Sequence, residues 1–367
     1  MRPHVEPTET LRTALRDPAS LAAWDVESLR SLIDVARVNA MLPILATGLA
    51  REGIFSKLPW RAQLVLQESL SPVHHRQKLV GYEIDRILRV VKRLKIRVIL
   101  LKGAAFVVGG LPAASGRSMS DLDILVPRED IDRVESALLD AGWKQSELSD
   151  HDEVYYRQWM HEIPPMWHPD RGMVVDIHHT IFPPTGCIRP DTEALFEAAV
   201  PLGGSGVWLL RPADMVLHSA CHLINEEFTQ PLRDLHDIHA LLQDFGKDPD
   251  FWQDLLERAC LHGLGRTLYY ALGHARAQFG TFVPPETSSV ITRHAPVGPL
   301  AILMDWVFRS AFVPLVPGQL QIERQVSFWL LLLRSHWLKM PPKLLIYHLS
   351  IKAWRGLRPN REKESHA

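Results

Sequence analysis

Residues 116–126 read Gly-Arg-Ser-Met-Ser-Asp-Leu-Asp-Ile-Leu-Val, and they carry the clearest structural pattern in this chain of 367 residues. From residue 122 to 126 the segment is apolar apart from one acid, which predicts a buried strand that Pro127 ends. Side chains of a strand alternate between its two faces, so Asp121 and Asp123 are expected on the same side. Two neighbouring carboxylates repel each other unless a cation lies between them, and Mg²⁺ prefers such oxygen ligands. A pair of solvated acids at the start of a strand is the alternative.

A third carboxylate lies on another expected strand, over residues 172–181. There Asp176 and His178 share one face, because they too are two residues apart. An acid pair on one strand and a single acid on another can build a two-metal phosphoryl-transfer site. Asp121 and Asp123 would hold both ions, and Asp176 would complete the second site and orient or deprotonate an attacking hydroxyl. Two Mg²⁺ ions are expected, with Mn²⁺ as an alternative.

Shorter segments around these strands predict a small α/β core. A β-branched run at 97–101 indicates a further buried strand, followed by Lys102-Gly103 and a loop rich in Gly, Pro and Ser. A helix is expected over 128–142 and a strand over 154–160.

Helical periodicity flanks this core on both sides. Before residue 95 the apolar residues recur at helical spacing, and Ser71-Pro72 is expected to interrupt a long helix. After the core, four helices are expected over 214–228, 232–245, 251–261 and 264–279, followed by a loop over 280–299. We therefore expect an α+β protein with a small mixed β-sheet. Its expected parts are an N-terminal helical region (1–95), the core (96–210) and a C-terminal helical domain with a basic tail (211–367).

Two residue pairs on these helices are spaced i, i+4. His218 and His222 could bind Zn²⁺, but the helix lacks the Glu of a metalloprotease, so a packed helix face is favoured. Arg233 and Asp237 predict an ordinary ion pair within a helix.

Composition and charge restrict the partners. Hydrophobic residues make up 46% of the chain, which is ordinary for a globular protein, and the net charge is −1. Residues 334–367 carry eight Lys or Arg and two Glu, a charge of +6, so the first 333 residues carry −7. These charges therefore disfavour a long nucleic acid as a partner and favour a small-molecule or protein acceptor. The tail could contact an anionic membrane surface or another polyanion, with a solvated helix face as the alternative.

Cysteines and apolar runs indicate the compartment. Cys187, Cys221 and Cys260 are far apart and form neither a disulfide framework nor a CxxC motif, so a reducing, cytoplasmic setting is expected. We also expect neither a signal peptide nor a membrane-spanning segment.

Three segments in order, at 101–105 (Leu-Lys-Gly-Ala-Ala), 116–126 and 175–178 (Val-Asp-Ile-His), resemble the polymerase-beta-type nucleotidyltransferase superfamily. Within it, the chain is most similar to the uncharacterised bacterial nucleotidyltransferases. The resemblance covers residues 98–181 and extends more loosely into the His-rich helices. It implies a Mg²⁺-dependent enzyme that moves a nucleoside monophosphate from an NTP to an acceptor hydroxyl and releases pyrophosphate.

The resemblance also implies roles for individual residues. Asp121, Asp123 and Asp176 would be the metal ligands, and the Lys102-Gly103 turn would replace the phosphate-cradling turn. That turn usually contains Gly-Ser, whereas Ala104 follows Gly103 here. The expected contacts to the nucleotide or acceptor are Lys102, Gly103, Arg117, Ser118, Ser120 and His178. Two alternatives stay open: an inactive nucleotide-binding or interaction protein on the same scaffold, and a toxin-like transferase that modifies tRNA or protein.

Overall fold

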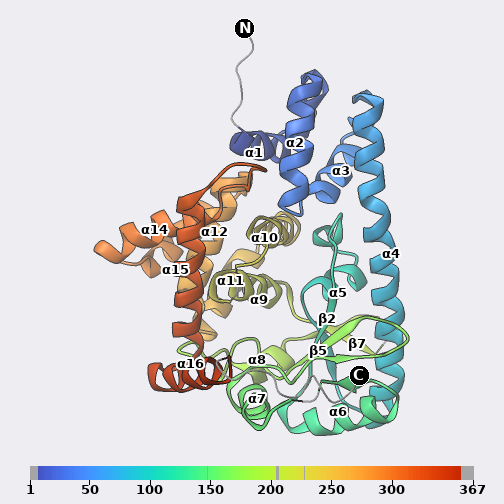
Figure 1. The fold of residues 1–367 in the computed structure, drawn as a ribbon, viewed down its shortest axis with the longest axis vertical. Helices are drawn as coiled ribbons and strands as arrows, with labels where there is room; N and C mark the ends of the chain where they lie inside the picture. Colours follow the sequence, from blue (N-terminus) through green and yellow to red (C-terminus); the bar gives the residue numbers. More distant parts are fainter. Residues whose placement is uncertain (1–6, 147, 204–205, 227, 357–367) are drawn as a thin grey trace.

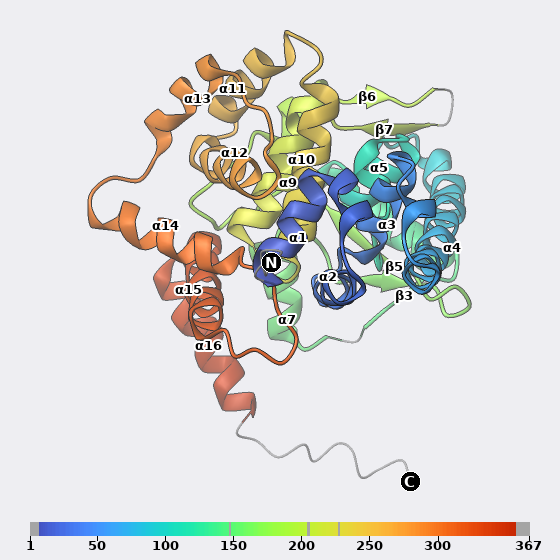
Figure 2. The same cartoon turned by 90° about the horizontal axis from the view of Figure 1, so that it is seen from above.

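A computed structural model describes residues 7–146, 148–203, 206–226 and 228–356 of the chain. The sheet lies at one end of the molecule beside the long helix α4, and the first three helices lie at the other end (Figure 1). The C-terminal helices form a block beside both, as the view from above also shows (Figure 2). The last residues of the predicted basic tail, 357–367, lie outside the described part.

The described strands form one mixed sheet of seven strands in the order β3-β4-β5-β2-β1-β7-β6. Strand β2 pairs in parallel with β5 and antiparallel with β1, and β1 pairs in parallel with β7. The strands are β1 (Val98–Leu100), β2 (Asp121–Leu125), β3 (Lys144–Gln145), β4 (Met166–Trp167), β5 (Val174–His178), β6 (Val200–Pro201) and β7 (Val207–Leu209). With helices packed around it, this mixed sheet confirms the predicted α+β class.

The centre of the sheet forms where the sequence is most apolar. All three residues of β1 are buried, and so are the four apolar residues that β2 and β5 direct away from their acids: Leu122, Ile124, Val175 and Ile177. Burial of branched apolar side chains on both faces explains why these short segments become central strands. The acidic face of β2 and β5 is thereby held in a fixed register.

The N-terminal helices are α1 (Pro7–Arg16), α2 (Val26–Val38), α3 (Leu42–Arg51) and α4 (Trp60–Val91). Helix α4 continues through Pro72, so the predicted interruption at Ser71-Pro72 is wrong. Pro72 and Glu68, whose carbonyl loses its helical partner, are both exposed, so water can replace the missing hydrogen bond. Buried residues on either side, Leu66 and Val73, keep both halves of the helix packed on the core.

Short helices connect the strands of the core. They are α5 (Lys102–Val108), α6 (Ile131–Asp140), α7 (Asp150–Val154) and α8 (Thr192–Glu197). A helix at α6 was expected, but the strand expected over 154–160 is wrong, because α7 continues into a π-helical turn, Tyr155–Trp159.

Tertiary contacts explain why this aromatic segment is helical. Arg157 forms an i, i+4 ion pair with Glu153 and a two-pronged ion pair with Glu135 of α6. Tyr155 and Trp159, one helical turn apart, both contact the ring of His348. These contacts outweigh the β propensity of the aromatic residues.

The four helices predicted after the core are present as α9 (Pro212–Asn225), α10 (Pro231–Phe245), α11 (Phe251–Leu261) and α12 (Gly265–Phe279). A further helix, α13 (Pro285–Ile291), lies within the segment expected to be a loop, and α14 (Pro299–Ala311), α15 (Ile322–Lys339) and α16 (Pro342–Gly356) follow. Arg334, the first basic residue of the predicted tail, donates to the carbonyl of Ile224 and so belongs to the packed helices. No helix in the described ranges is long and apolar enough to span a membrane.

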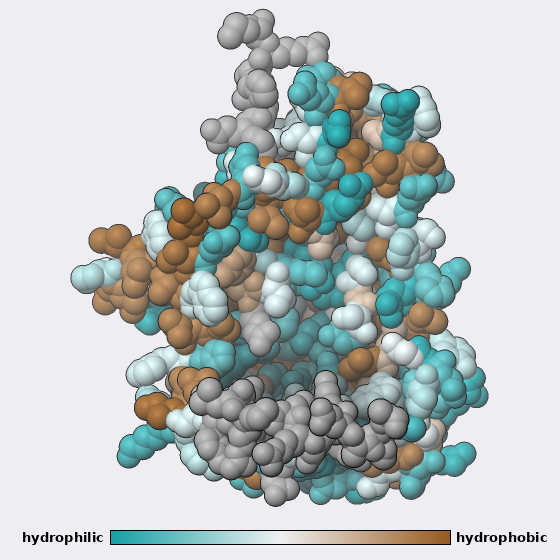
Figure 3. All heavy atoms as spheres, viewed as in Figure 1, coloured by the Kyte–Doolittle hydropathy of each residue, from teal (hydrophilic) through white to brown (hydrophobic). Residues whose placement is uncertain are grey.

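One outer face of the C-terminal block is apolar. Figure 3 shows apolar side chains gathered over α14 and α15. On α15 the exposed apolar residues follow helical spacing: Ile322, Val326, Trp329, Leu333 and Trp337.

Candidate active site

The register of β2 and β5 brings the predicted acids together. Asp123 pairs with Asp176 and Leu125 with His178 across the parallel strands. Since both strands alternate in step, Asp121 and Asp123 share one face of the sheet with Asp176 and His178. The three predicted metal ligands and the predicted His therefore come from adjacent strands.

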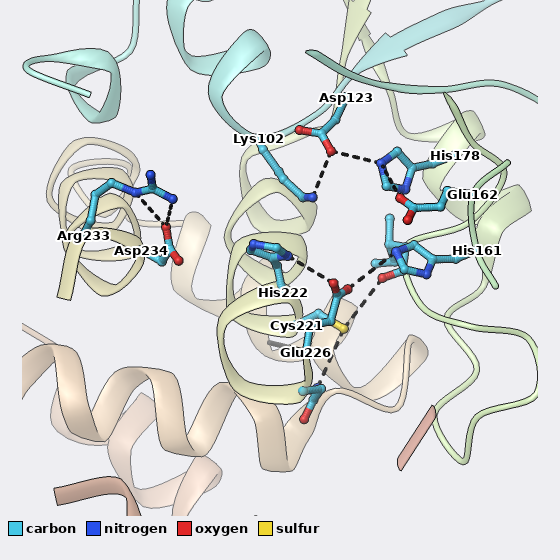
Figure 4. A network of polar contacts seen from close by, with 12 residues as sticks. Lys102, Asp123, His161, Glu162, His178, Cys221, His222, Glu226, Arg233 and Asp234 are labelled. Atoms are coloured by element: carbon cyan, nitrogen blue, oxygen red, sulfur yellow. Dashed lines mark hydrogen bonds and ion pairs between the residues drawn. The ribbon is translucent and has the colours of Figure 1, made fainter. Parts of the chain in front are cut away.

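Asp123 is the best-partnered acid on this face. Its Oδ1 lies 2.9 Å from Lys102 Nζ and 3.0 Å from His178 Nε2, as Figure 4 shows. Burial alone would raise the pKa of Asp123, but the charge of Lys102 and the His178 hydrogen bond outweigh it and hold that pKa well below its usual range. Burial would likewise lower the pKa of Lys102, but the nearby charge of Asp123 raises it. The pair is therefore fully charged at neutral pH.

Asp176 has the opposite environment. Burial and the charges of Asp123 and Glu162 raise its pKa to about 7. Its Oδ1 is buried without a hydrogen-bond partner. His178 only partly offsets the negative charge around this carboxyl group, and a divalent cation could supply the rest.

A second group of side chains faces these acids: His161, Glu162, His222 and Glu226. Of these, only His222 was singled out from the sequence. Glu226 follows α9 and lies 3.2 Å from His222 Nδ1 and 3.7 Å from His161 Nε2. Glu162 lies 3.5 Å from His178 Nε2. Figure 4 shows that these side chains extend from α9 and from the segment before β4 toward Asp123 and Lys102. Burial would raise the pKa of Glu226, but the charge of His161 and the hydrogen bond from His222 outweigh it and hold that pKa well below its usual range.

The sequence contains only a weak signal for this second group of side chains. His161-Glu162 interrupts an aromatic segment, and such polar pairs occur in many loops. Their proximity to the acids depends on the backbone pairing of Glu162 with His178, an isolated antiparallel bridge.

The Lys102-Gly103 turn is held in a strained conformation. Lys102 has a φ of +46°, a region that residues with a side chain rarely adopt. A Cβ on Gly103 would collide with a guanidinium nitrogen of Arg117, so a larger residue there would displace that buried side chain. The turn and Arg117 therefore form one packed unit.

Arg117 faces α10. It is 8% exposed, and its Nε donates to Asp237 Oδ2 at 2.6 Å. Burial raises the pKa of Asp237 to about 6 although Arg117 opposes the shift. Because Arg117 takes Asp237, Arg233 pairs with Asp234 at 2.6 Å, and the predicted Arg233–Asp237 pair is wrong.

The two serines before β2 lie on the outside of the loop. Ser118 and Ser120 are exposed, while Met119 between them and Arg117 before them are buried. Ser120 Oγ lies 3.4 Å from Asp121 Oδ1. Lys102, His178 and Ser120 thus border the acids, whereas Ser118 is exposed on the loop and Arg117 covers Gly103.

The donor set fits divalent cations. Five carboxylates (Asp121, Asp123, Glu162, Asp176 and Glu226) lie in this region, and within the described residues the only Lys or Arg bonded to them is Lys102. The surplus of negative charge and the unpartnered Asp176 oxygen both favour an added cation.

Comparison with known proteins is consistent with this geometry. A family model described as "Uncharacterised nucleotidyltransferase" matches residues 26–280. No curated protein matches the chain. The match begins at α2, includes the whole sheet and ends just after α12, so it contains every residue of the candidate site. The chain belongs to the uncharacterised nucleotidyltransferase family.

Proposed function

We propose that this protein is a Mg²⁺-dependent enzyme that transfers a nucleoside monophosphate from an NTP to an acceptor hydroxyl and releases pyrophosphate. Membership of a nucleotidyltransferase family supports the transfer chemistry. The observation that carries the proposal is the alignment of Asp123 with Asp176 beside Asp121, with one oxygen of Asp176 unpartnered. This arrangement suits a pair of ions better than a structural role.

Asp121, Asp123 and Asp176 would hold the metal. Bound there, Mg²⁺ supplies positive charge for the oxygens of the reacting phosphate. Lys102 extends into the same space with its charge maintained by Asp123, so it is placed to bind triphosphate oxygens. Ser118 and Ser120 can donate hydroxyl hydrogen bonds from the rim. Arg117 donates to Asp237, so we assign it a positioning part: it fixes the Gly103 turn that carries Lys102.

The proton balance assigns a part to Asp176. The acceptor oxygen forms a bond to the α-phosphorus, the bond from that phosphorus to the bridging oxygen breaks, and pyrophosphate leaves with the electron pair. The hydroxyl proton goes to a carboxylate, and Asp176, the single acid on β5, would accept it or orient the hydroxyl.

The acceptor would lie between the sheet and the C-terminal helices. His222 and Glu226 face the acids from that side and can hydrogen-bond a hydroxyl-bearing molecule. The −7 charge of residues 1–333 favours a small molecule or a protein over a long nucleic acid.

The test is label transfer. Purified protein is incubated with each α-labelled NTP, Mg²⁺ or Mn²⁺, and a cell extract as the acceptor source. We expect one extract component to acquire label, and the double variant Asp121→Asn, Asp123→Asn to lose the transfer. Asp132→Asn, a carboxylate that is 93% exposed on α6, is the matched control and should transfer normally. Equal labelling by the double variant and the wild type would refute the proposal.

One observation favours a second candidate, an inactive nucleotide-binding protein. Ala104 provides no hydroxyl after the Lys102-Gly103 turn, and Lys102 is already paired with Asp123. Calorimetry separates the two: NTP binding without pyrophosphate release across a broad set of acceptors would establish the second candidate.

A further inference from the structure

A separate set of potential metal ligands adjoins the carboxylates. His161, Glu162 and His178 each offer one ligand atom, and these atoms all lie within 4.8 Å of one another. We propose that this His161–Glu162–His178 cluster binds a transition-metal ion of the Zn²⁺ or Mn²⁺ type. The site is distinct from the one proposed for Mg²⁺, because none of its three ligands belongs to the aspartate trio. It does not depend on nucleotidyl transfer.

The separations suit a compact coordination sphere. Tetrahedral bonds of about 2.0–2.1 Å place ligand atoms roughly 3.3 Å apart. Glu162 Oε2 lies 3.5 Å from His178 Nε2, and the ligand atom of His161 lies within 4.8 Å of both. Small side-chain shifts would bring the three ligands to bonding distance.

The backbone holds the three ligands in place before any ion binds. Glu162 and His178 form an antiparallel bridge. On either side of it, the Ile163 N–H donates to Ile177 O at 3.0 Å and the His179 N–H donates to His161 O at 2.9 Å. A site whose ligands are positioned by paired backbone needs little reorganisation to bind.

The two histidines lack the partners of ordinary core residues. Both are nearly fully buried, at 4% and 1% exposure, and the Nδ1 of each is buried without a hydrogen-bond partner. A buried structural His normally has partners for both ring nitrogens.

Ligand chemistry selects the type of ion. Two imidazoles and one carboxylate are the donors of open zinc sites, whereas Mg²⁺ prefers oxygen alone. Asp123 and Glu226 border the two histidines, at 3.0 Å from His178 Nε2 and 3.7 Å from His161 Nε2. These two carboxylates face the ring nitrogens that would bind the ion, so their negative charge adds to the attraction for a cation.

The experiment uses the full chain freed of metal by chelation. Co²⁺ is titrated in while its visible absorption is recorded, and Zn²⁺ is then added as a competitor. With Mg²⁺ present in large excess to occupy the aspartate trio, we expect one Co²⁺ per chain, which Zn²⁺ then displaces. His161→Gln should weaken binding at least tenfold.

His179→Gln is the matched control. His179 is a neighbouring buried histidine, but its Nε2 contacts Met160 O, and as the next residue along the strand it points away from His178. This variant should bind Co²⁺ as the wild type does. Asp121→Asn should also bind normally, which separates failure of this site from failure of the proposed transfer.

X-ray absorption of the Zn²⁺-loaded wild type tests the proposal without any variant, so the result does not depend on whether a variant folds. Scattering from two imidazoles is expected. A sphere of oxygen ligands only, or binding that His161→Gln and His179→Gln leave equally unchanged, would overturn the proposal.

Discussion

Two buried aspartates in this molecule have similar partners but different surroundings. Asp123 on β2 contacts Lys102 and His178, whereas Asp214 on α9 contacts Arg258 and His262. Each is thus an acid between one permanent cation and one imidazole, and each joins parts of the chain that are distant in sequence.

Around Asp214 both carboxylate oxygens and both ring nitrogens of His262 have partners. Arg258 donates to both carboxylate oxygens, at 2.7 and 2.6 Å, and His262 lies 3.2 Å away. The other nitrogen of His262 accepts from the Asp191 N–H at 3.1 Å. Asp214 is completely buried, so this closed cluster ties α9 to α11 and the segment before α8.

Around Asp123 the charges do not balance. Asp121, Asp176, Glu162 and Glu226 lie in the same region, and Asp176 Oδ1 and the Nδ1 atoms of His161 and His178 have no partner. In a buried cluster whose charges balance, the groups satisfy one another and hold the fold together. In a cluster with excess negative charge, the unbalanced groups favour binding of a cation. The difference between the two clusters is therefore the best physical sign of function in this protein.

The largest expected effect comes from opening the closed cluster. Asp214→Asn leaves the buried Arg258 without its counter-charge and should reduce the free energy of unfolding by about 3–5 kcal/mol. Urea unfolding measures the loss. Label transfer per folded molecule should stay near the wild-type value, and a variant that unfolds like the wild type would show that the cluster is not structural.

The reciprocal change should affect activity instead. Asp123→Asn removes the acid shared by Lys102 and His178, and we expect label transfer to fall by roughly 10²–10³-fold. Its urea midpoint should change much less than that of Asp214→Asn. If both variants lost stability equally, the distinction between the two clusters would fail.

Cation binding should depend on pH through Asp176. Since its pKa is raised to about 7, the carboxyl must release a proton before it can bind Mg²⁺. Below pH 7 the Mg²⁺ affinity should fall by about tenfold per pH unit, and above it the affinity should level off. Calorimetric titrations at a series of pH values give the curve, which Asp176→Asn should flatten.

The smallest expected effect is that Asp176→Asn makes the metal-free protein more stable. The folded protein retains the Asp176 proton up to about pH 7, while the unfolded chain releases it near 3.8. Stability from this group is therefore present below pH 3.8 and lost as pH rises through 7. Asp176→Asn cannot ionise, so it should be more stable than the wild type at pH 8. At pH 3.5 the two should unfold alike, and a gain of equal size at both pH values would argue against charge as the cause.

The pattern of residues along single elements was sufficient to predict much of this protein. Alternation at Asp121 and Asp123 placed both acids on one face of β2, and helical periodicity located α9 to α12. The aspartate trio could be inferred because on each strand the apolar residues occupy one face and the acids therefore occupy the other. Alternation is a local property, so it can be read without knowing what packs against the strand.

Contacts between distant segments could not be predicted in this way. Arg117 bonds Asp237 across 120 residues, and this contact displaced the expected Arg233 pair. His161 and Glu162 join the site only because their segment pairs with the end of β5, after a helical turn that Arg157 and two aromatic side chains stabilise against local propensity. The sequence thus determined which strand carries the acids. Only the tertiary structure decided which cation and histidines reach them, because packing and charge pairing depend on neighbours that no local pattern specifies.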